Sequence, residues 1–380
     1  MMQHKRRPRS ITGSLLAIIS MLALGFPGPG SADPKFKRAL GDSHFFSSVP
    51  FPGYPEGIAV HGNRVYVSGP AMFGVPANGV PSRIFAFDLE TGDLEDEIEI
   101  LGQNMLLPKA VSAITFYNDD ALYVLDSQQG VLRIDMETGI QTTYSAPFFP
   151  FFSSPFAHPA PLLINDLAFD NEGYLYVTDS FQATIWRVPP DGGAPEIWFH
   201  DPGIDGFFGP NGIRFDKKGE YLYFSVTAVN TGQGIVYRLP PIDNPALSDL
   251  EVFHTYSPEW PEFLAPGPDG IAFGKSGRLY VALAGTSQIS VLDPEGVEIA
   301  RYLGPAQTSD PASPLPWVNP ANIAFNSREK TLLVTNHANR TGLPDPGDLF
   351  AVFDVFVKDK AGGLPERHED EDEDHIDDEE

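Results

Sequence analysis

The chain of 380 residues contains no cysteine, which excludes disulfide bonds, thiolate nucleophiles and cysteine-ligated metal sites. Basic residues are scarce, because 25 Lys and Arg stand against 51 Asp and Glu and give a formal net charge of −26. This balance argues against nucleic acid and against an anionic membrane as partners. Helical periodicity is also missing outside the N-terminal segment, and alternation with a period of two residues dominates instead. The sequence therefore predicts an all-β protein.

Both ends of the chain differ in composition from the rest. Basic residues, the apolar run Leu15–Leu24 and the small residues Gly30-Ser31-Ala32 predict a cleaved export signal over residues 1–32, the alternative being an uncleaved anchor. The apolar run is shorter than the roughly 20 residues of a membrane-spanning helix. The acidic residues 366–380 predict a disordered, solvating tail, with weak cation collection as the alternative. We therefore expect a folded domain over residues 33–365 of a secreted or periplasmic protein.

A short motif recurs six times between these ends. Its copies are EGIAV at 56–60, SAITF at 112–116, NDLAF at 165–169, NGIRF at 211–215, DGIAF at 269–273 and ANIAF at 321–325. The copies follow one another at intervals of 46 to 58 residues, which indicates a repeat architecture. A turn and a second apolar strand follow each copy, and most units add a third strand. Units of successive antiparallel strands that are too apolar to stand alone predict a six-bladed β-propeller.

The first residue of each motif copy is expected to face the central channel of the propeller. These positions are Glu56, Ser112, Asn165, Asn211, Asp269 and Ala321, with Asn322 adjacent to the last. Because the innermost strands surround one axis, side chains at equal register lie at equal height around it. Each of these residues could instead serve only as a turn former, as Asn-Gly and Asp-Gly often do. Glu is not a favoured turn residue, so Glu56 weighs most in favour of a site.

Four of the six positions offer oxygen ligands of the kind that calcium prefers. Ca²⁺ takes six to eight oxygens from carboxylates, amide carbonyls and water, whereas zinc prefers His and Cys. We expect Glu56, Asn165, Asn211 and Asp269 to bind one Ca²⁺, which leaves coordination positions for water and substrate. A second, structural calcium ion is left open.

The motifs PEGIAV, INDLAFDNEG, GPNGIRFD and GPDGIAF resemble those of the senescence marker protein/gluconolactonase/regucalcin family of six-bladed calcium propellers. Paraoxonases and diisopropylfluorophosphatase are more distant relatives. The resemblance covers roughly residues 50–357. It implies that Glu56, Asn165, Asn211 and Asp269 are the calcium ligands, one from each of four blades. It also implies Ca²⁺-dependent hydrolysis of a small-molecule lactone or related ester.

In chemistry of this kind the metal polarises the carbonyl, and a carboxylate or histidine activates water. Asp269 is expected to act as a ligand and as a base. Asp166 matches the Asn-Asp pair of the family and is a second candidate, although it could equally be a turn or supporting residue. His337, at the end of a strand in the last blade, is a third candidate. His158 precedes Asn165, but a lone histidine is more often an ordinary hydrogen-bonded residue.

Loops rich in Pro, Phe and Trp lead into the ring positions, and they lack Lys and Arg. They include SAPFFPFFSSPFAHPAP, PGIDGFFGP, YSPEWPEFLAPGP and SDPASPLPWVNP. We expect an apolar substrate site over the calcium, unless these aromatics only cover the core. Its predicted substrate residues are Phe149, Phe151, Phe152, Trp260, Trp317 and Asn322.

Two other functions remain open from the sequence. One is a non-catalytic propeller that uses calcium for rigidity and its loop face for a ligand or protein partner. The other is a strictosidine-synthase-like condensing enzyme, against which Glu56 and Asp269 argue because that reaction needs no metal set.

Overall fold

The computed structural model describes residues 38–73, 75–117, 121–158, 160–257, 266–304, 315–339 and 349–363. The chain divides into two compact units, Met1–Lys37 and Arg38–Glu380, and all described residues belong to the second. Both the expected export signal and the expected acidic tail lie outside the described residues. Among the described residues, no helix is long and apolar enough to cross a membrane.

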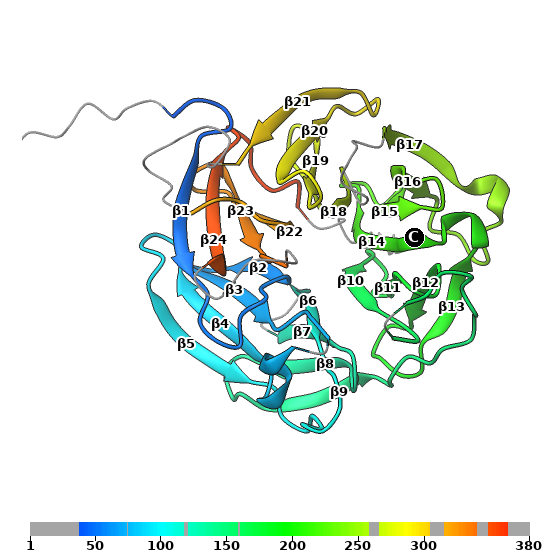
Figure 1. Ribbon diagram of the computed structural model, residues 1–380, viewed down its shortest axis with the longest axis horizontal. Coiled ribbons are helices and arrows are strands. Elements are labelled where there is room, and N and C mark those ends of the chain that lie inside the picture. The colour runs from blue at the N-terminus through cyan, green and yellow to red at the C-terminus, as the bar shows by residue number, and fades with distance from the viewer. Residues whose placement is uncertain are drawn as a thin grey trace, which may run out of the picture. The chain divides into compact units, whose positions relative to one another are not determined.

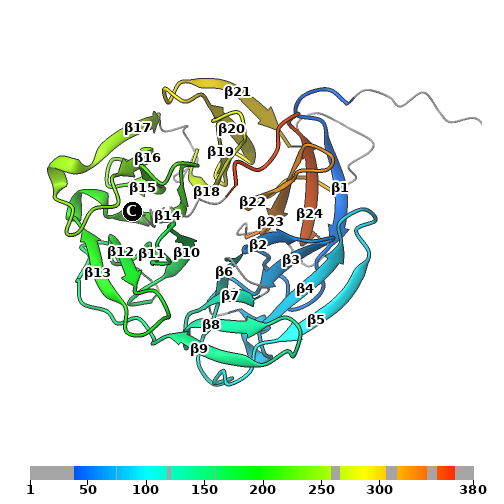
Figure 2. The same cartoon turned by 180° about the vertical axis from the view of Figure 1, so that it is seen from behind.

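Within the described ranges, 24 strands form six four-stranded antiparallel sheets arranged around a ring (Figure 1). The same ring is seen from behind in Figure 2. The first three blades comprise β2 (Ile58–His61), β3 (Arg64–Gly69), β4 (Arg83–Asp88) and β5 (Leu94–Glu99); β6 (Val111–Phe116), β7 (Ala121–Asp126), β8 (Gly130–Asp135) and β9 (Gln141–Ser145); and β10 (Ile164–Phe169), β11 (Leu175–Asp179), β12 (Thr184–Val188) and β13 (Glu196–His200). The next two comprise β14 (Gly206–Phe215), β15 (Leu222–Val229), β16 (Gly234–Leu239) and β17 (Glu251–Tyr256); and β18 (Pro268–Phe273), β19 (Leu279–Leu283), β20 (Gln288–Leu292) and β21 (Glu298–Leu303). The predicted six-bladed propeller is therefore confirmed.

The last blade is built from both ends of the domain. It contains β22 (Pro320–Asn326), β23 (Thr331–Asn336) and β24 (Ala351–Phe356), and its outer strand is β1 (Ser43–Ser48). β1 pairs antiparallel with β24, so that Ser43 lies opposite Val355. Short 3₁₀ segments occur in the connections at η1 (Pro76–Gly79), η2 (Pro202–Ile204) and η3 (Leu247–Asp249).

The hydrophobic core lies between the blades. Each of six clusters of buried apolar residues combines side chains from two neighbouring sheets. The repeat explains one contact that recurs at five of these interfaces, where a Tyr of a second strand packs against the Phe that ends the motif in the next blade. The pairs are Tyr66–Phe116, Tyr123–Phe169, Tyr176–Phe215, Tyr223–Phe273 and Tyr280–Phe325, with ring centroids 4.8–5.4 Å apart. A single blade cannot bury these rings alone, and so the closed ring is the folding unit.

Candidate functional site

A cavity of about 410 Å³ lies at the beginning of the inner strands. All six positions predicted from the repeat line it: Glu56, Ser112, Asn165, Asn211, Asp269 and Ala321. Each comes from a different blade. The common register of the motif is what brings them together.

Irregular strand pairing shapes the start of four inner strands. In each of them the first two motif residues lie opposite a single residue of the second strand, which is the signature of a β-bulge. The single residues are Thr178, Ser225, Ala282 and Thr335, in β11, β15, β19 and β23 respectively. A bulge twists the strand locally and changes the direction of its side chains, which is why bulges often occur beside functional sites.

Three of these single residues carry hydroxyls that connect neighbouring blades. Each accepts a hydrogen bond from a bulge N–H of its own blade and donates to the carbonyl of a cavity residue in the next blade. The accepted bonds are Asp166 N–H to Thr178 (3.0 Å), Gly212 N–H to Ser225 (2.9 Å) and Asn322 N–H to Thr335 (2.9 Å). The donated bonds are Thr178 to Asn211 O (2.5 Å), Ser225 to Asp269 O (2.6 Å) and Thr335 to Glu56 O (3.1 Å). The hydroxyls thereby hold the backbone of three predicted ligands.

The blades approach so closely here that side chains at the second motif position are restricted. A Cβ atom on Gly212 would lie 2.8 Å from the Cα atom of Gly270, closer than real Cβ atoms come. Glycine at this position therefore allows Asn211 and Asp269 to approach one another.

Both amide side chains are oriented by hydrogen bonds within their own blades. Asn165 Nδ2 donates to Ser180 Oγ at 3.3 Å, and Asn211 Nδ2 donates to Thr227 Oγ1 at 2.9 Å. Asn211 Oδ1 is buried and has no hydrogen-bond partner among the described residues. An orphaned carbonyl oxygen beside a cavity costs free energy unless water or a ligand satisfies it.

The two carboxyl groups of the cavity destabilise one another. Burial raises the pKa of Glu56 well above its usual range, and the negative charges of Asp269 and Asp166 raise it further. Burial and Asp166 also raise the pKa of Asp269, against the donated hydrogen bonds of the Asn211 amide and the Gly270 N–H. No Lys or Arg lines the described wall of this cavity. A cation is therefore the species that would relieve the repulsion.

His337 lies beside Glu56 on the cavity wall. Its Nε2 is 3.8 Å from Glu56 Oε2 and 3.3 Å from the carbonyl oxygen of Ala71. Burial lowers the pKa of His337 to about 4, and the Ala71 carbonyl only partly opposes this. The imidazole is therefore neutral at pH 7.

The donor set fits a calcium ion better than a zinc ion. Two carboxylates and two amides line the cavity, and one amide oxygen is buried without a partner. Within the described ranges, no group of three or more His, Asp or Glu side chains is gathered for metal binding. Amide oxygens mixed with carboxylates suit Ca²⁺, a hard cation that accepts a flexible arrangement of oxygen ligands.

Asp166 does not line this cavity, and its carboxylate is committed elsewhere. Its Oδ1 accepts from the Leu167 N–H at 2.9 Å, and its Oδ2 accepts from Ile213 N–H at 3.2 Å and Arg214 Nη1 at 2.7 Å. The side chain is 2% exposed. This placement favours a supporting role for Asp166 over the predicted role of a base, because no substrate in the cavity can reach a carboxylate enclosed by its own partners.

Three phenylalanines expected at the substrate site pack elsewhere. Phe149 and Phe151 contact the buried Trp186, with centroids 5.0 and 5.5 Å away, and Phe152 contacts His200 at 4.7 Å. None of them lines the cavity. Trp186, in β12 of the same blade, is the apolar partner of this loop, and Gln182 Oε1 accepts hydrogen bonds from the Phe151 and Phe152 N–H groups at 2.9 and 2.8 Å.

A different group of aromatic residues lines the cavity. It consists of His158, Phe181, Phe207 and Phe208, and below we refer to it as the aromatic wall. His158 stacks on Phe181 at 4.1 Å, and Phe181 contacts Phe208 at 5.7 Å. Phe156, at the end of the loop that carries Phe149, supports Phe207 at 4.9 Å. The paired phenylalanines in PGIDGFFGP were the sequence signal for this wall.

The remaining predicted substrate residues are not at the cavity or not described. Trp317 is 3% exposed and packs with Phe353 in the core between two blades. Asn322 is 4% exposed, and its Oδ1 accepts from the Ile323 N–H at 2.8 Å, so it caps its own strand. Trp260 lies outside the described residues.

Comparisons with known proteins agree with the fold that the sequence repeat predicts. In solved structures, the chain is similar to regucalcin of Agrobacterium tumefaciens strain C58, described as a calcium-binding protein, with 18% identity over 86% of this chain and 97% of that one and a TM-score of 0.58. It is similar to an auxiliary nutrient binding protein of Bacteroides thetaiotaomicron (13% identity, 82% and 75% coverage, TM-score 0.57). It is also similar to a luciferin-regenerating enzyme (14% identity, 85% and 96% coverage, TM-score 0.51). At these identities the likeness concerns the fold alone.

No curated protein matches the chain in a sequence search. The model of the SMP-30/Gluconolactonase/LRE-like region matches residues 82–338. This range includes Asn165, Asn211, Asp269 and His337, while Glu56 lies before it. With the match covering more than half of its 380 residues, the chain belongs to the SMP-30/gluconolactonase/LRE-like family.

Proposed function

We propose that this protein is an exported, calcium-dependent hydrolase of lactones or related esters, with its active site in the cavity of about 410 Å³. The observation that carries the proposal is the convergence of the buried Glu56 carboxyl, the half-buried Asp269 carboxyl and the orphaned Asn211 carbonyl oxygen on one cavity whose described residues include no Lys or Arg. Membership of the family supports the reaction class. The N-terminal basic and apolar segment supports export.

Four side chains would hold the ion: Glu56, Asn165, Asn211 and Asp269. When bound, calcium supplies a positive charge that polarises the substrate carbonyl and stabilises negative charge on its oxygen. The hydroxyls of Thr178, Ser225 and Thr335 fix the ligand backbones beforehand, so that little reorganisation is required during the reaction.

Asp269 is the residue best placed to activate water. Its side chain is half-buried and faces the cavity, whereas Asp166 is enclosed by its partners. In the reaction, water adds to the carbonyl carbon and passes a proton to Asp269. The acyl C–O bond then breaks, and the leaving oxygen takes the proton to give a hydroxy acid or an alcohol and an acid. His337 remains neutral and limits the approach of solvent to Glu56.

The aromatic wall sets the substrate class. Phe207 is 41% exposed and lines the cavity together with Phe181 and Phe208, so a substrate in the cavity would contact aromatic rings. A lactone or ester with an apolar or aromatic acyl part gains from contact with such rings, at about 1.5–3 kcal/mol for a fully buried aromatic or aliphatic group. We therefore propose apolar lactones and esters over free sugar lactones.

The proposal is tested with the purified full chain by elemental analysis and by hydrolysis of a small aliphatic lactone, a long-chain lactone and an aryl ester. We expect bound calcium, turnover that ends in excess chelator and returns with calcium, and a loss of at least a hundredfold in Asp269→Asn. Asp243→Asn on the surface is the matched control, because Asp243 pairs with Arg187 on another blade. Calcium binding without turnover of any substrate would instead identify a non-catalytic calcium propeller, and absence of calcium binding would refute the metal site.

A further inference from the structure

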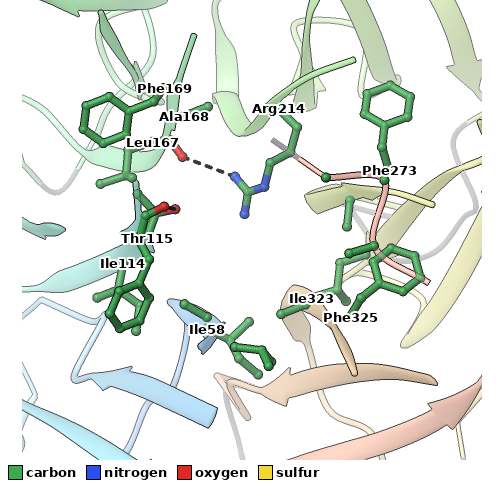
Figure 3. Close-up of a pocket in the computed structure, with 18 of the residues that line it drawn as sticks. Ile58, Ile114, Thr115, Leu167, Ala168, Phe169, Arg214, Phe273, Ile323 and Phe325 are labelled. Atoms are coloured by element: carbon green, nitrogen blue, oxygen red, sulfur yellow. Dashed lines mark hydrogen bonds between the residues drawn. The ribbon is translucent and has the colours of Figure 1, made fainter. Parts of the chain in front are cut away.

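A second cavity of about 370 Å³ lies at the other end of the same inner strands. The first residue of each motif copy lines the first cavity. The second cavity is lined by the third to fifth motif residues in four blades and by the fourth and fifth in the other two, which are Arg214 and Phe215 and Ala272 and Phe273. With a rise of about 3.3 Å per residue, the two cavities are separated by roughly three residues of strand. Figure 3 shows the second cavity, with side chains from the inner strands around an open space.

The wall of this cavity is almost entirely apolar. Ile58, Ile114, Leu167 and Ile323 surround it, and Figure 3 shows them on different blades. The fourth motif residue is small in five blades, namely Ala59, Thr115, Ala168, Ala272 and Ala324, and these five line the cavity. Small residues at this register are what leave the space open.

Arg214 is the exception to the repeat. It occupies the fourth motif position in β14, where four other blades have Ala and one has Thr. Figure 3 shows its guanidinium reaching into the space enclosed by the apolar residues. Its side chain is 25% exposed, and no other Lys or Arg is among the described residues that line this cavity.

The contacts of Arg214 use only one of its three nitrogens. Nη1 donates to Asp166 Oδ2 at 2.7 Å and to the carbonyls of Ile213 and Leu167 at 2.5 and 3.4 Å. Nε and Nη2 have no partner among the described residues. These two nitrogens form the edge of a guanidinium that binds a carboxylate through two parallel hydrogen bonds.

A purely structural ion pair with Asp166 explains the contacts of Nη1 but not the position of Nε and Nη2 of Arg214. Asp166 also accepts from two backbone N–H groups, at 2.9 and 3.2 Å, so its charge is compensated from three sides. The guanidinium consequently keeps positive potential on its other edge. That edge faces an apolar cavity, where a charge-assisted hydrogen bond is stronger than in water.

We propose that this second cavity binds a small carboxylate with an apolar body, and that the carboxylate pairs with Nε and Nη2 of Arg214. Its volume falls within the roughly 300–1,000 Å³ of small-molecule sites, which are mostly apolar with few polar groups that fix orientation. The charge of Arg214 selects a carboxylate over a neutral or cationic amphiphile. The site shares no lining residue with the first cavity, and its ligand takes no part in the proposed hydrolysis.

Calorimetric titration with decanoate tests the proposal, with decanol and decyltrimethylammonium as neutral and cationic ligands of similar length. The full chain is titrated in excess EDTA, so that calcium at the first cavity does not contribute. We expect one decanoate per chain and at least tenfold weaker binding of the other two probes. Arg214→Gln should weaken decanoate binding by about 10- to 100-fold, as expected when hydrogen bonds to a charged group are lost.

Two further variants separate this interpretation from loss of folding. Arg238→Gln is the matched control, because Arg238 also pairs with a carboxylate but lies in β16 and contacts Glu251, away from the cavity. It should leave the affinity unchanged. Ala324→Leu keeps Arg214 and its pair with Asp166 but fills the cavity, and it should abolish binding.

Three results would overturn the proposal. Equal affinity for decanoate and decanol would show that Arg214 does not recognise the ligand. Unchanged binding in folded Ala324→Leu would place decanoate elsewhere. Binding that occurs only in a chain ending at Gly363, which lines the cavity, would show that the acidic sequence beyond it excludes small carboxylates.

Discussion

Replacing Glu56 with Gln should change protein stability in opposite directions in the absence and presence of calcium. Without a cation, burial and the charges of Asp269 and Asp166 all disfavour ionised Glu56, which is why its pKa is raised. Gln keeps the shape of the side chain and removes the charge. In chelator at pH 7 we therefore expect Glu56→Gln to melt at a higher temperature than the wild type.

The pH dependence follows from the sign of the pKa shift. A carboxyl group with a raised pKa in the folded state binds protons more tightly there than in the unfolded chain. Its contribution to stability is present below the ordinary pKa of about 4.5 and is lost as the pH rises through the raised pKa of the folded protein. The advantage of Glu56→Gln in chelator should therefore be smallest below about pH 4.5 and should grow as the pH rises.

Calcium should reverse the order of the two melting temperatures. A ligand at 100 times its Kd stabilises the native state by about 2.7 kcal/mol, whereas a ligand at its Kd contributes only about 0.4 kcal/mol. A variant whose calcium affinity falls a hundredfold therefore loses about 2.3 kcal/mol of ligand stabilisation at the same calcium concentration. For a domain of this size that difference corresponds to roughly 3 °C in Tm.

Differential scanning calorimetry in EDTA and in calcium, at several pH values, measures the Tm difference between variant and wild type in both conditions. Glu172→Gln is the matched control, because Glu172 is exposed in the turn between β10 and β11, and its Tm should follow the wild type in every condition. The reasoning fails if Glu56→Gln lowers Tm equally with and without calcium. It also fails if calcium raises the Tm of the variant as much as that of the wild type.

Three further predictions follow from the same site. The pKa of His337 is lowered by burial to about 4 from the ordinary 6.5, so stability in chelator should decline as the pH falls from about 6.5 toward 4; His337→Gln should flatten that part of a Tm profile against pH. Ser225→Ala removes the hydrogen bond to Asp269 O and should weaken calcium binding by about tenfold in calorimetry, with an unchanged circular dichroism spectrum; unchanged affinity would show that the bond does not position the ligand. Phe208→Ser should reduce turnover of long-chain lactones relative to a small lactone by about 10- to 100-fold, whereas Phe151→Ser should lower Tm without changing that ratio; the opposite pattern would return substrate selection to the loop of Phe151.

The sequence predicted the propeller and the composition of the cavity because both follow from register. Six copies of a motif with one apolar anchor fix how each inner strand is placed relative to the axis. The first motif residue must then lie at the same height in every blade, and all six indeed line one cavity. No knowledge of loop conformation is needed for this step.

The loops could not be predicted in the same way, because no repeat constrains them. Phe149 and Phe207 both lie in Pro- and Gly-containing segments that lead into a ring position. Only the positions of their partners distinguish them: Phe149 finds Trp186 at the outer part of its blade, and Phe207 lines the cavity. The supporting role of Asp166 was not apparent from the repeat for a related reason, because its partner Arg214 comes from the next blade. The hydroxyls of Thr178, Ser225 and Thr335 were visible in YVTD, YFSV and LVTN, and equal register would have identified them.

The pairing of β1 with β24 has a consequence for how the chain folds. Ser43 is paired with Val355, so β1 can pair only after a strand 312 residues later in the chain has been synthesised. Closing a loop of that length is slow and entropically costly, and the first strand stays unpaired until nearly the whole domain has left the ribosome. Folding intermediates therefore carry an open ring whose first and last inner strands lack neighbours. The hydrogen bond that the Thr335 hydroxyl donates to the Glu56 carbonyl crosses this seam, so the cavity proposed to bind calcium is complete only in molecules whose ring has closed.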